Sequence, residues 1–378
     1  MRCAEPRTIH VFEPTSFWGR GHSETCFRIC SHWPGYGQET KIYTTLAHRP
    51  SPSRLLYPVL PHWLPAPIKS RIHDFLGQDA LRCRSEAAGL RRVQAGDICY
   101  FWPGTSNAAM QAARNKGATV VLEFINTHVA YAKRILDEEC DRLGIPSITT
   151  DLDIEGEEQR LALADFAFAP GPFVGDSIRR SSPSDVEILE TSYGAYVPKR
   201  VPDRLWQTRP MRFLFVGLFG VRKGAHTLLD AWKKADINAE LHIVGSISPE
   251  LRARLDATED DRLRYLGYRA DIGAVYSQSD VFVFPSLEEG GPQVTYEAAS
   301  YGLPLVVTAM GGGRIADVEN AIIVPNSDSD ALAKAFVRLN EDRELAESMG
   351  RAARRAALQF DWSEVARQRL ALLDAAIS

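Results

Sequence analysis

Short apolar runs alternate with stretches of helical periodicity along the whole chain. Several runs are almost continuous Val, Ile, Leu and Phe, which is typical of strands covered on both faces. In the first half the predicted strands are Thr8–Phe12, Lys41–Leu46, Asp97–Phe101, Ala118–Phe124, Asp165–Ala169 and Glu187–Thr191. In the second half they are Arg212–Gly217, Glu240–Gly245, Val281–Phe284, Leu305–Thr308 and Ile322–Val324. Alternation of such strands with helices predicts parallel sheets in an α/β protein.

A break between the two sets of strands falls at Val197–Asp203, which contains two prolines and several charges. The chain has 378 residues, more than one ordinary core holds. We therefore expect a Rossmann-like domain over residues 1–198 and a second over 205–360, both doubly wound and facing a cleft. Ligands bind such sheets at the carboxyl ends of the strands, so we expect the site in that cleft.

The last part of the chain has amphipathic helical periodicity over residues 328–345 and 350–374. A helix cap at Asp361-Trp362-Ser363 interrupts the second pattern. We expect residues 361–378 to form a helix that packs back toward the first domain.

Composition excludes some classes of protein. The chain is 45% apolar and 24% charged, as in globular proteins, and its net charge of −4 gives no reason to expect nucleic acid as a partner. No apolar stretch approaches the ~20 residues of a membrane helix, and the first residues lack a signal-peptide core. We therefore expect a cytoplasmic protein, with peripheral membrane contact left open.

The six cysteines lie in the first half and are expected to be free thiols. His22, Cys26, Cys30 and His32 form one group, three of which share a face if residues 23–33 are helical. Zinc binding and a buried helix face are the two interpretations. We favour the buried face, because the usual paired ligand spacing is missing.

Two glutamates eight positions apart follow the predicted strand Val281–Phe284. Glu289 precedes Gly290, Gly291 and Pro292, and Glu297 follows Pro292 by about a turn and a half of helix. This places two carboxylates and a helix N-terminus at one crevice, which suits polyhydroxylated, anionic ligands. Taken singly, either glutamate could be an ordinary exposed residue near a helix start.

Basic and glycine residues follow another strand. After Arg212–Gly217 come Gly220, Arg222, Lys223 and Gly224, just before a predicted helix. A helix N-terminus with added positive charge is an anion site, so diphosphate binding is one interpretation. A solvated surface turn is the other.

Two further glycine-rich turns could hold phosphate. Gly311, Gly312 and Gly313 follow the strand Leu305–Thr308 and could form a nest of backbone N–H groups or a flexible loop. In the first domain, Gly19 and Gly21 follow the first strand without the full dinucleotide fingerprint. They could close over a phosphate or form an ordinary tight turn.

Together these pieces resemble the retaining glycosyltransferases of family 4, which have the two-domain GT-B fold. The resemblance is strongest from Arg212 onward. It rests on Glu289 and Glu297, which match the E-x7-E motif, and on the segments Arg222–Gly224, Tyr301–Pro304, Gly311–Gly313, Phe360–Ser363, Ala164–Val174 and Tyr193-Gly194. The ordered set is more specific than any single motif.

The resemblance implies roles for these residues. Glu297 would bind the ribose of a nucleotide-sugar, and Glu289 would contact the transferred sugar. The amides of Gly290 and Gly291 would hold sugar hydroxyls or phosphate, and Lys223 with Arg222 would stabilise the leaving diphosphate.

The resemblance also gives His128 a place near the sugar and acceptor. In contrast, Leu218 stands where the family often has an arginine, Gly291 where it often has an aromatic residue, and no Pro-Glu follows the second glycine loop. Donor preference could therefore be unusual.

The expected reaction is retaining, metal-independent transfer of a hexose from a UDP- or GDP-sugar to a glycan, lipid-linked or small-molecule acceptor, in cell-surface polysaccharide or glycoconjugate biosynthesis. No cofactor is expected, and Asp151-Leu152-Asp153 is interpreted as a chance D-x-D. The alternatives are a non-catalytic nucleotide-sugar or glycan-binding module and a sugar-nucleotide epimerase of the same fold. A dehydrogenase is disfavoured because the full G-x-G-x-x-G is absent.

The acceptor side has the weakest sequence signal. Arg54–Leu76 contains aromatic, proline and basic residues, and four more arginines follow by residue 92. This region could lie on anionic lipid headgroups or be a solvated loop and helix, and both interpretations stay open.

Overall fold

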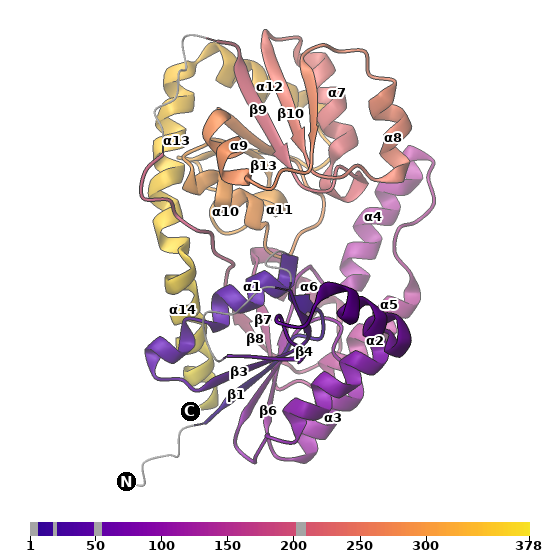
Figure 1. Cartoon of the computed structure of the whole chain (residues 1–378). Helices are drawn as coiled ribbons and strands as arrows, with labels where there is room; N and C mark the ends of the chain where they lie inside the picture. Colours follow the sequence, from indigo (N-terminus) through magenta and orange to yellow (C-terminus); the bar gives the residue numbers. More distant parts are fainter. Residues whose placement is uncertain (1–6, 18–20, 49–54, 202–208) are drawn as a thin grey trace.

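The computed structural model describes residues 7–17, 21–48, 55–201 and 209–378, which form two α/β domains, one above the other in Figure 1. All strand pairings in this part of the chain are parallel. The predicted fold class, two doubly wound sheets facing a cleft, is confirmed.

The first domain contains an eight-stranded sheet in the order β2-β3-β1-β5-β6-β7-β8, with β4 added beside β3. Its strands are β1 (Ile9–Phe12), β2 (Ser16–Phe17), β3 (Thr40–Ala47), β4 (Leu56–Leu60), β5 (Ile98–Phe101), β6 (Thr119–Glu123), β7 (Phe166–Ala169) and β8 (Glu187–Glu190). Its helices are α1 (Gly21–Cys30), η1 (Trp33–Tyr36), α2 (Ala66–Leu90), α3 (Asn107–Asn115), α4 (Val129–Leu143), α5 (Asp151–Leu161) and α6 (Pro172–Ser181).

The second domain contains a six-stranded sheet in the order β11-β10-β9-β12-β13-β14. Its strands are β9 (Met211–Val216), β10 (Ala239–Val244), β11 (Leu263–Gly267), β12 (Val281–Phe284), β13 (Leu305–Thr308) and β14 (Ala321–Val324). Its helices are η2 (Val221–Lys223), α7 (Ala225–Ala235), α8 (Pro249–Asp256), α9 (Ile272–Gln278), α10 (Gln293–Ser300), α11 (Ala309–Gly312), α12 (Ser329–Glu341), α13 (Arg343–Ala357) and η3 (Leu358–Phe360).

The continuous apolar runs became the central strands, because both faces of each sheet are covered by helices. All four residues of β12 are buried, and so are all four of β13. The strands that the sequence pattern missed lie at the sheet edges. β11 exposes Arg264 and Tyr265, and β4 contains Pro58, so neither has the apolar run of a central strand.

The C-terminal helices differ from the prediction. Where the sequence predicted helices over residues 328–345 and 350–374, the structure has three α-helices, of which α14 (Trp362–Ile377) is the last. Asp342 ends α12 and caps α13, where its carboxylate accepts from the Leu345 amide at 2.9 Å. The predicted cap at Asp361 is confirmed, since its carboxylate accepts from the Ser363 amide at 3.0 Å.

Helix α14 leaves the second domain and packs on the first, along one side of the molecule in Figure 1. Trp33 donates its indole N–H to the Ala366 carbonyl at 2.9 Å. Arg369 reaches the core of the first domain and pairs with Glu123 at 2.9 Å, with both side chains fully buried. The chain therefore passes between the domains twice, once at the linker near residue 198 and once between η3 and α14.

Helix α4 crosses to the second domain on the opposite side from α14 (Figure 1). Cys140 is buried in the apolar core of the second domain. The neighbouring Glu139 accepts hydrogen bonds from His226 and from the Ser327 hydroxyl, the latter at 2.9 Å. Burial opposes ionisation here, but these hydrogen bonds and that of Arg142 lower the pKa of Glu139 to about 2. The domains are thus in contact at both sides of the cleft.

No helix in the described ranges is both long enough and apolar enough to cross a membrane.

Candidate functional site

A pocket of about 670 Å³ lies between the domains at the carboxyl ends of β9 and β10. Its first-domain wall is one side of α1, including Thr25 and Arg28, and its second-domain wall includes Glu297 of α10. We call this the strand-end pocket. It lies where doubly wound sheets bind their ligands.

Two glycines form part of this pocket by ending adjacent strands. Gly217 ends β9 with φ 141° and Gly245 ends β10 with φ 130°, backbone conformations that side-chain-bearing residues rarely adopt. A Cβ atom on Gly245 would also overlap the Gly217 carbonyl oxygen. Both positions therefore need glycine, and the absence of side chains leaves the strand ends accessible to a ligand.

Glu297 is a predicted site residue that lines the strand-end pocket. It lies on α10, and the Tyr276 hydroxyl donates a hydrogen bond to its Oε2 at 2.9 Å. Burial raises the pKa of Glu297. The carboxylate retains acceptor capacity beyond this one bond, so it is able to accept from ligand hydroxyls.

Glu289 and Lys223 form an ion pair, although the resemblance gave them separate ligands. Both side chains are nearly buried, at 8% and 11% exposure. Ser286 donates to the same Glu289 oxygen at 3.0 Å, and the Lys223 ammonium lies 5.5 Å from the centre of the Phe284 ring. Burial lowers the pKa of Lys223, and the neighbouring carboxylate of Glu289 opposes that effect.

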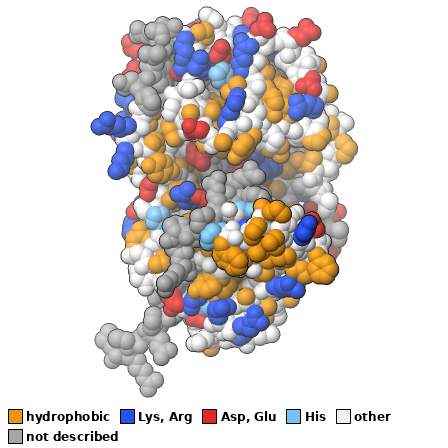
Figure 2. Space-filling model, viewed as in Figure 1, with side chains coloured by type: hydrophobic (Ala, Val, Ile, Leu, Met, Phe, Trp, Pro, Cys, Tyr) orange, Lys and Arg blue, Asp and Glu red, His pale blue; other side chains and the backbone are white. Residues whose placement is uncertain are grey.

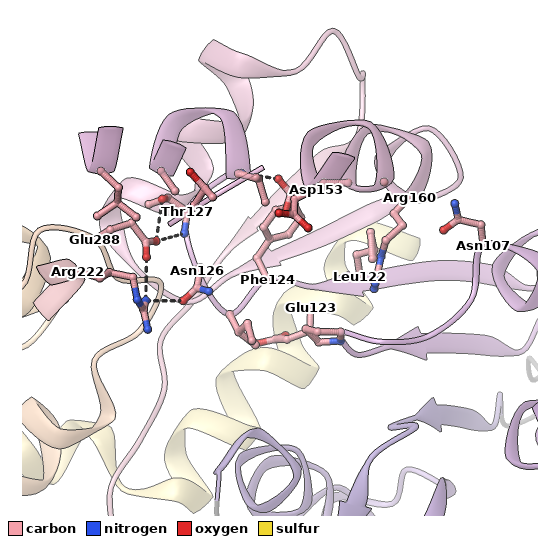
Figure 3. A pocket seen from close by; sticks show the side chains of 18 residues that line it. Asn107, Leu122, Glu123, Phe124, Asn126, Thr127, Asp153, Arg160, Arg222 and Glu288 are labelled. Carbon is pink, nitrogen blue, oxygen red and sulfur yellow. Dashed lines mark hydrogen bonds and ion pairs between the residues drawn. The ribbon is translucent and has the colours of Figure 1, made fainter. Parts of the chain in front are cut away.

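Arg222 points away from the strand-end pocket, toward the first domain. It donates to Glu288 at 2.9 Å and to the Asn126 side chain at 3.3 Å (Figure 3). Glu288, which the sequence reasoning missed, also accepts from the amide and the hydroxyl of Thr127, each at 2.8 Å. Its carboxylate thus joins the two domains. No motif in the sequence includes Glu288, because its pairing depends on the first domain.

A second pocket, of about 530 Å³, begins at Arg222 and Glu288 and extends into the first domain between α4 and α5. Figure 3 shows it with Asn126 and Thr127 at one end and Arg160 and Asn107 at the other. We call this the first-domain pocket.

The first-domain pocket has both apolar and acidic walls. Phe124 and Leu122 from the end of β6 form part of the apolar wall. Glu157 of α5 accepts from the Val129 amide at 2.6 Å, and burial raises the pKa of Glu157 to about 7. Such a mixture of flat apolar surface and carboxyl acceptors suits a sugar-like ligand.

Gly290 and Gly291 contact the first domain in this structure. A Cβ atom on Gly290 would overlap the backbone of Ile125 and Asn126, and one on Gly291 would overlap the Tyr193 ring. Their predicted role as amide donors to the sugar was therefore incomplete, because domain contact alone requires glycine here. An aromatic side chain at position 291 would not fit, because the Tyr193 ring occupies that space.

The structure places Gly311 and Gly312 in a short helix instead of an open loop, and their predicted contact with phosphate stays a prediction. Met310, Gly311 and Gly312 are buried in the one-turn helix α11, and Thr308 caps it by accepting from the Gly311 amide at 3.0 Å. The glycines permit close packing, since a Cβ on Gly311 would overlap the Phe284 carbonyl oxygen.

Arg314, just after this turn, makes a contact between the domains that the sequence did not predict. Its side chain crosses to the first domain, where it donates to the Thr191 carbonyl at 2.6 Å and pairs with Glu190.

The remaining predicted glycines have different positions. Gly21 lines the strand-end pocket with φ 68°. Gly220 is buried beside Ser248 and precedes η2. Gly19 lies outside the described residues. Leu218 is exposed and does not line the strand-end pocket. The position where the family often has an arginine therefore supplies no positive charge here.

His128 does not line either pocket. Its ring is fully buried, its Nδ1 accepts from the Ala130 amide at 3.2 Å, and its Nε2 lies 3.0 Å from Glu158. Burial lowers the pKa of His128. The ring faces Glu157 and Glu158 of α5, and the predicted contact of His128 with sugar or acceptor stays a prediction. The exposed Asn126, two residues earlier, occupies the cleft instead.

In the group His22, Cys26, Cys30 and His32, the two cysteines lie on a buried helix face, whereas the two histidines are partly exposed. Cys26 and Cys30 are both fully buried in the core of the first domain, beside Ile29 and Trp33. Within the described ranges, no group of three or more His, Cys, Asp or Glu side chains is placed to hold a metal ion.

Comparison with known proteins matches residues 210–342 to the family described as glycosyl transferases group 1. An Escherichia coli UDP-Gal:alpha-D-GlcNAc-diphosphoundecaprenol alpha-1,3-galactosyltransferase is 38% identical over 86 residues, 22% of each chain. The D-rhamnosyltransferase WbpZ of Pseudomonas aeruginosa is 33% identical over 165 residues, 41% of this chain and 43% of that one. The matched segments thus span less than half the length of these curated relatives.

The fold comparison extends over the whole chain. A sucrose-phosphate synthase from Thermosynechococcus elongatus aligns with a TM-score of 0.73 at 18% identity, covering 98% of this chain and 99% of that one. This likeness supports the GT-B arrangement of the two domains. The predicted resemblance to family 4 glycosyltransferases is confirmed.

Proposed function

We propose, from the match of residues 210–342 to the family described as glycosyl transferases group 1, that the protein is a retaining, metal-independent glycosyltransferase. It transfers a hexose from a UDP- or GDP-sugar to a glycan, lipid-linked or small-molecule acceptor, in polysaccharide or glycoconjugate biosynthesis. The observation on which the proposal rests is the position of Glu297 in a pocket that the carboxyl ends of two glycine-terminated strands share with the first domain.

The nucleotide occupies the strand-end pocket in this proposal. Glu297 accepts hydrogen bonds from the ribose hydroxyls, while Tyr276 fixes the carboxylate from the other side. Gly217 and Gly245 leave the backbone open to the ligand, and Arg269 contributes positive charge at the pocket wall. Charged acceptors for vicinal hydroxyls give the strong hydrogen bonds that nucleotide selection needs.

The transferred sugar lies toward the pair formed by Lys223 and Glu289 in this proposal. A ligand that reaches the pair would change the partners of both groups, with a sugar hydroxyl donating to Glu289 and a phosphate oxygen accepting from Lys223. The ammonium is nearly desolvated already, so it interacts strongly with charge that develops on the leaving group.

The proposed chemical step needs no protein nucleophile. The bond from C1 to the diphosphate oxygen breaks, and the acceptor oxygen forms its bond to C1 on the same face. The acceptor proton passes to the leaving phosphate, which balances the charge that departs with the bonding electrons. Lys223 stabilises that phosphate, and the proposal assigns no step to a metal ion.

The first-domain pocket receives the acceptor in this proposal. It adjoins the cleft at Arg222 and Glu288, and its carboxyl and amide groups suit the hydroxyls of a sugar. The Escherichia coli relative uses a lipid-linked sugar as acceptor, as its name states. This supports, for the present chain, an acceptor whose sugar enters this pocket while any carrier remains outside.

Two measurements test the proposal. A panel of UDP-, GDP- and ADP-sugars is first screened for thermal stabilisation, because binding to the native state raises the unfolding temperature. The stabilising sugar is then incubated with candidate acceptors in EDTA, and the anomeric configuration of the product is determined by NMR. We expect an acceptor-dependent glycoside with the donor's configuration.

Each other outcome contradicts a defined part of the proposal. Binding without turnover on any acceptor would favour a binding module, and a changed sugar nucleotide without acceptor would favour an epimerase. An inverted product would exclude the retaining mechanism, and loss of activity in EDTA that Mg²⁺ restores would exclude metal independence.

A further inference from the structure

Helix α2 of the first domain begins with large apolar side chains directed into solvent. Trp63 is 70% exposed, Ile68 is 44% exposed and Phe75 is 87% exposed. Figure 2 shows hydrophobic side chains gathered over the start of α2, with Lys and Arg side chains at the margins. Together with Arg71 they form what we call the outer stripe.

The outer stripe follows helical geometry. Ile68, Arg71 and Phe75 stand at positions i, i+3 and i+7 of one helix, so they share a face, and Trp63 lies just before its first turn. The side chains on this face are exposed and do not pack in the core of the first domain. The stripe is therefore a continuous surface rather than isolated exposed residues.

The inner face of the same helix is already packed. Ile72 and Leu76 contact a small apolar cluster built on Leu46, Leu60 and Leu81. Lys69 is buried with them and donates its ammonium to the Ala47 carbonyl at 2.7 Å. The segment from Trp63 to Phe75 thus buries a lysine and exposes a tryptophan and a phenylalanine, so the outer stripe is not a shifted core face.

A backbone break separates this first segment from the rest of α2. Gly77 has φ 75° and ψ 162°, which are not helical, and no atom would contact a Cβ at this position. The direction of the helix therefore changes after Leu76. The outer stripe is carried on a short segment of its own, Ala66 to Leu76.

The exposed charge along α2 and the residues that flank it is mainly positive. Between residues 61 and 92, four arginines are exposed, namely Arg71, Arg84, Arg91 and Arg92. The exposed acids in that range are two, Asp74 and Asp79, and Asp79 pairs with Arg82 at 3.0 Å. An apolar helix face with cations beside it matches the interface of a membrane that contains anionic lipids.

We propose that the outer stripe docks on an anionic lipid bilayer. Trp63, Ile68 and Phe75 enter the boundary between headgroups and acyl chains, and Arg71 contacts a lipid phosphate. The inner face keeps its packing on the first domain, so docking requires no unfolding. Such contact would hold the first-domain pocket beside the membrane, but the docking itself does not depend on the proposed transferase activity.

Vesicle co-sedimentation of the full chain tests this proposal without any sugar substrate. Vesicles of phosphatidylcholine alone are compared with vesicles of phosphatidylcholine and phosphatidylglycerol in equal parts, at low and at high salt. We expect binding to the mixed vesicles that weakens as salt rises, because exposed charges are screened.

Three variants locate the contact. The double variant Trp63→Ser/Phe75→Ser is expected to lower affinity for the mixed vesicles roughly thirtyfold, because it removes most of the apolar contact. Arg71→Glu is expected to lower affinity about tenfold and to remove most of the preference for phosphatidylglycerol. Val318→Ser is the matched control, since Val318 is 92% exposed but lies in the second domain between two acidic residues. It should bind like the wild type.

Several results would overturn the proposal. Failure of the wild type to bind mixed vesicles at low salt would do so, and so would unchanged binding by a folded Trp63→Ser/Phe75→Ser variant. Sedimentation equilibrium supplies the other decisive result. A dimer that the same double variant converts to monomer would identify the stripe as a self-association surface instead of a lipid contact.

Discussion

Within the second domain, the loop after β12 and helix α10 hold their carboxylates in opposite surroundings. Glu288 is paired with Arg222 and accepts a hydrogen bond from Thr127, and Glu289 is paired with Lys223. Glu297, one turn into the next helix, lines an open pocket and accepts a hydrogen bond from the Tyr276 hydroxyl. The comparison teaches that a motif can contain both structural and ligand-accessible groups. The predictions below separate the two kinds, beginning with the largest expected effect.

Lys223→Met should have the largest effect, because it leaves Glu289 buried without its cation. Breaking a buried pair from one side costs about 3–5 kcal/mol. We expect a loss of that size in the free energy of unfolding, measured in urea, together with loss of glycosyl transfer.

The double variant Lys223→Met/Glu289→Met sharpens this result. It should recover most of the stability, because no unpaired charge remains, but it should stay inactive. Lys234→Met is the control, since Lys234 pairs with Asp330 on the exposed surface. Recovered activity in the double variant would show that the pair has only a structural role.

Glu297→Gln should weaken donor binding without destabilising the fold. Loss of a charged hydrogen bond of about 1.5–3 kcal/mol corresponds to roughly a ten- to hundredfold rise in Kd. Burial already disfavours the charged form of Glu297, so a neutral amide is compatible with the site. Calorimetric titration with the stabilising nucleotide-sugar measures the change, and an unchanged Kd would remove the assigned role.

Gly290→Ala should disturb the contact between the domains more than either domain core. The added methyl group would overlap the backbone of Ile125 and Asn126, and overpacking of this kind costs about 1–3 kcal/mol. We expect a lower unfolding temperature and a larger radius of gyration by X-ray scattering.

Gly35→Ala is the matched control for that substitution, because no atom lies near an added Cβ at Gly35. A Gly290→Ala variant with the unfolding temperature and scattering profile of the wild type would show that the observed domain contact is not maintained in solution.

Glu157→Gln should have the smallest effect and should appear mainly as a change in pH dependence. Burial raises the pKa of Glu157 from 4.5 to about 7. The folded state then binds more protons than the unfolded state between those values, so this residue contributes stability at low pH that is lost as pH rises from 4.5 through 7.

We therefore expect Glu157→Gln to gain on the order of 1–2 kcal/mol relative to the wild type between pH 5 and pH 8, allowing for partial exposure. Chemical denaturation across that range measures the difference, with exposed Glu187→Gln as control. Parallel pH profiles of Glu157→Gln and wild type would show that this carboxyl group is not desolvated.

Much of the fold follows from local sequence. The central strands are predicted because a strand covered on both faces must be apolar along its whole length, as in Val281–Phe284. The edge strands β4 and β11 were missed because Pro58 and the exposed Arg264 interrupt that pattern. The C-terminal boundaries depended on capping, and Asp361 was found while Asp342 was not.

The candidate site was predictable where chemistry and backbone coincide along the chain. Glu297, Lys223 and Glu289 were selected from residue type, spacing and resemblance, and the structure places all three near the cleft between the domains. The sequence did not predict the partners of Arg222 and His128. Arg222 is directed to Glu288, and His128 caps α4 with its ring against α5.

The sequence by itself determined the layered α/β architecture and the short list of charged groups, because strand periodicity and helix starts are local properties. Tertiary structure alone decided which of those groups remain accessible. Gly290 meets Ile125, and Glu288 meets Thr127, across more than 160 residues of chain. Pairing and burial depend on how the two domains approach each other, and no local pattern encodes that approach.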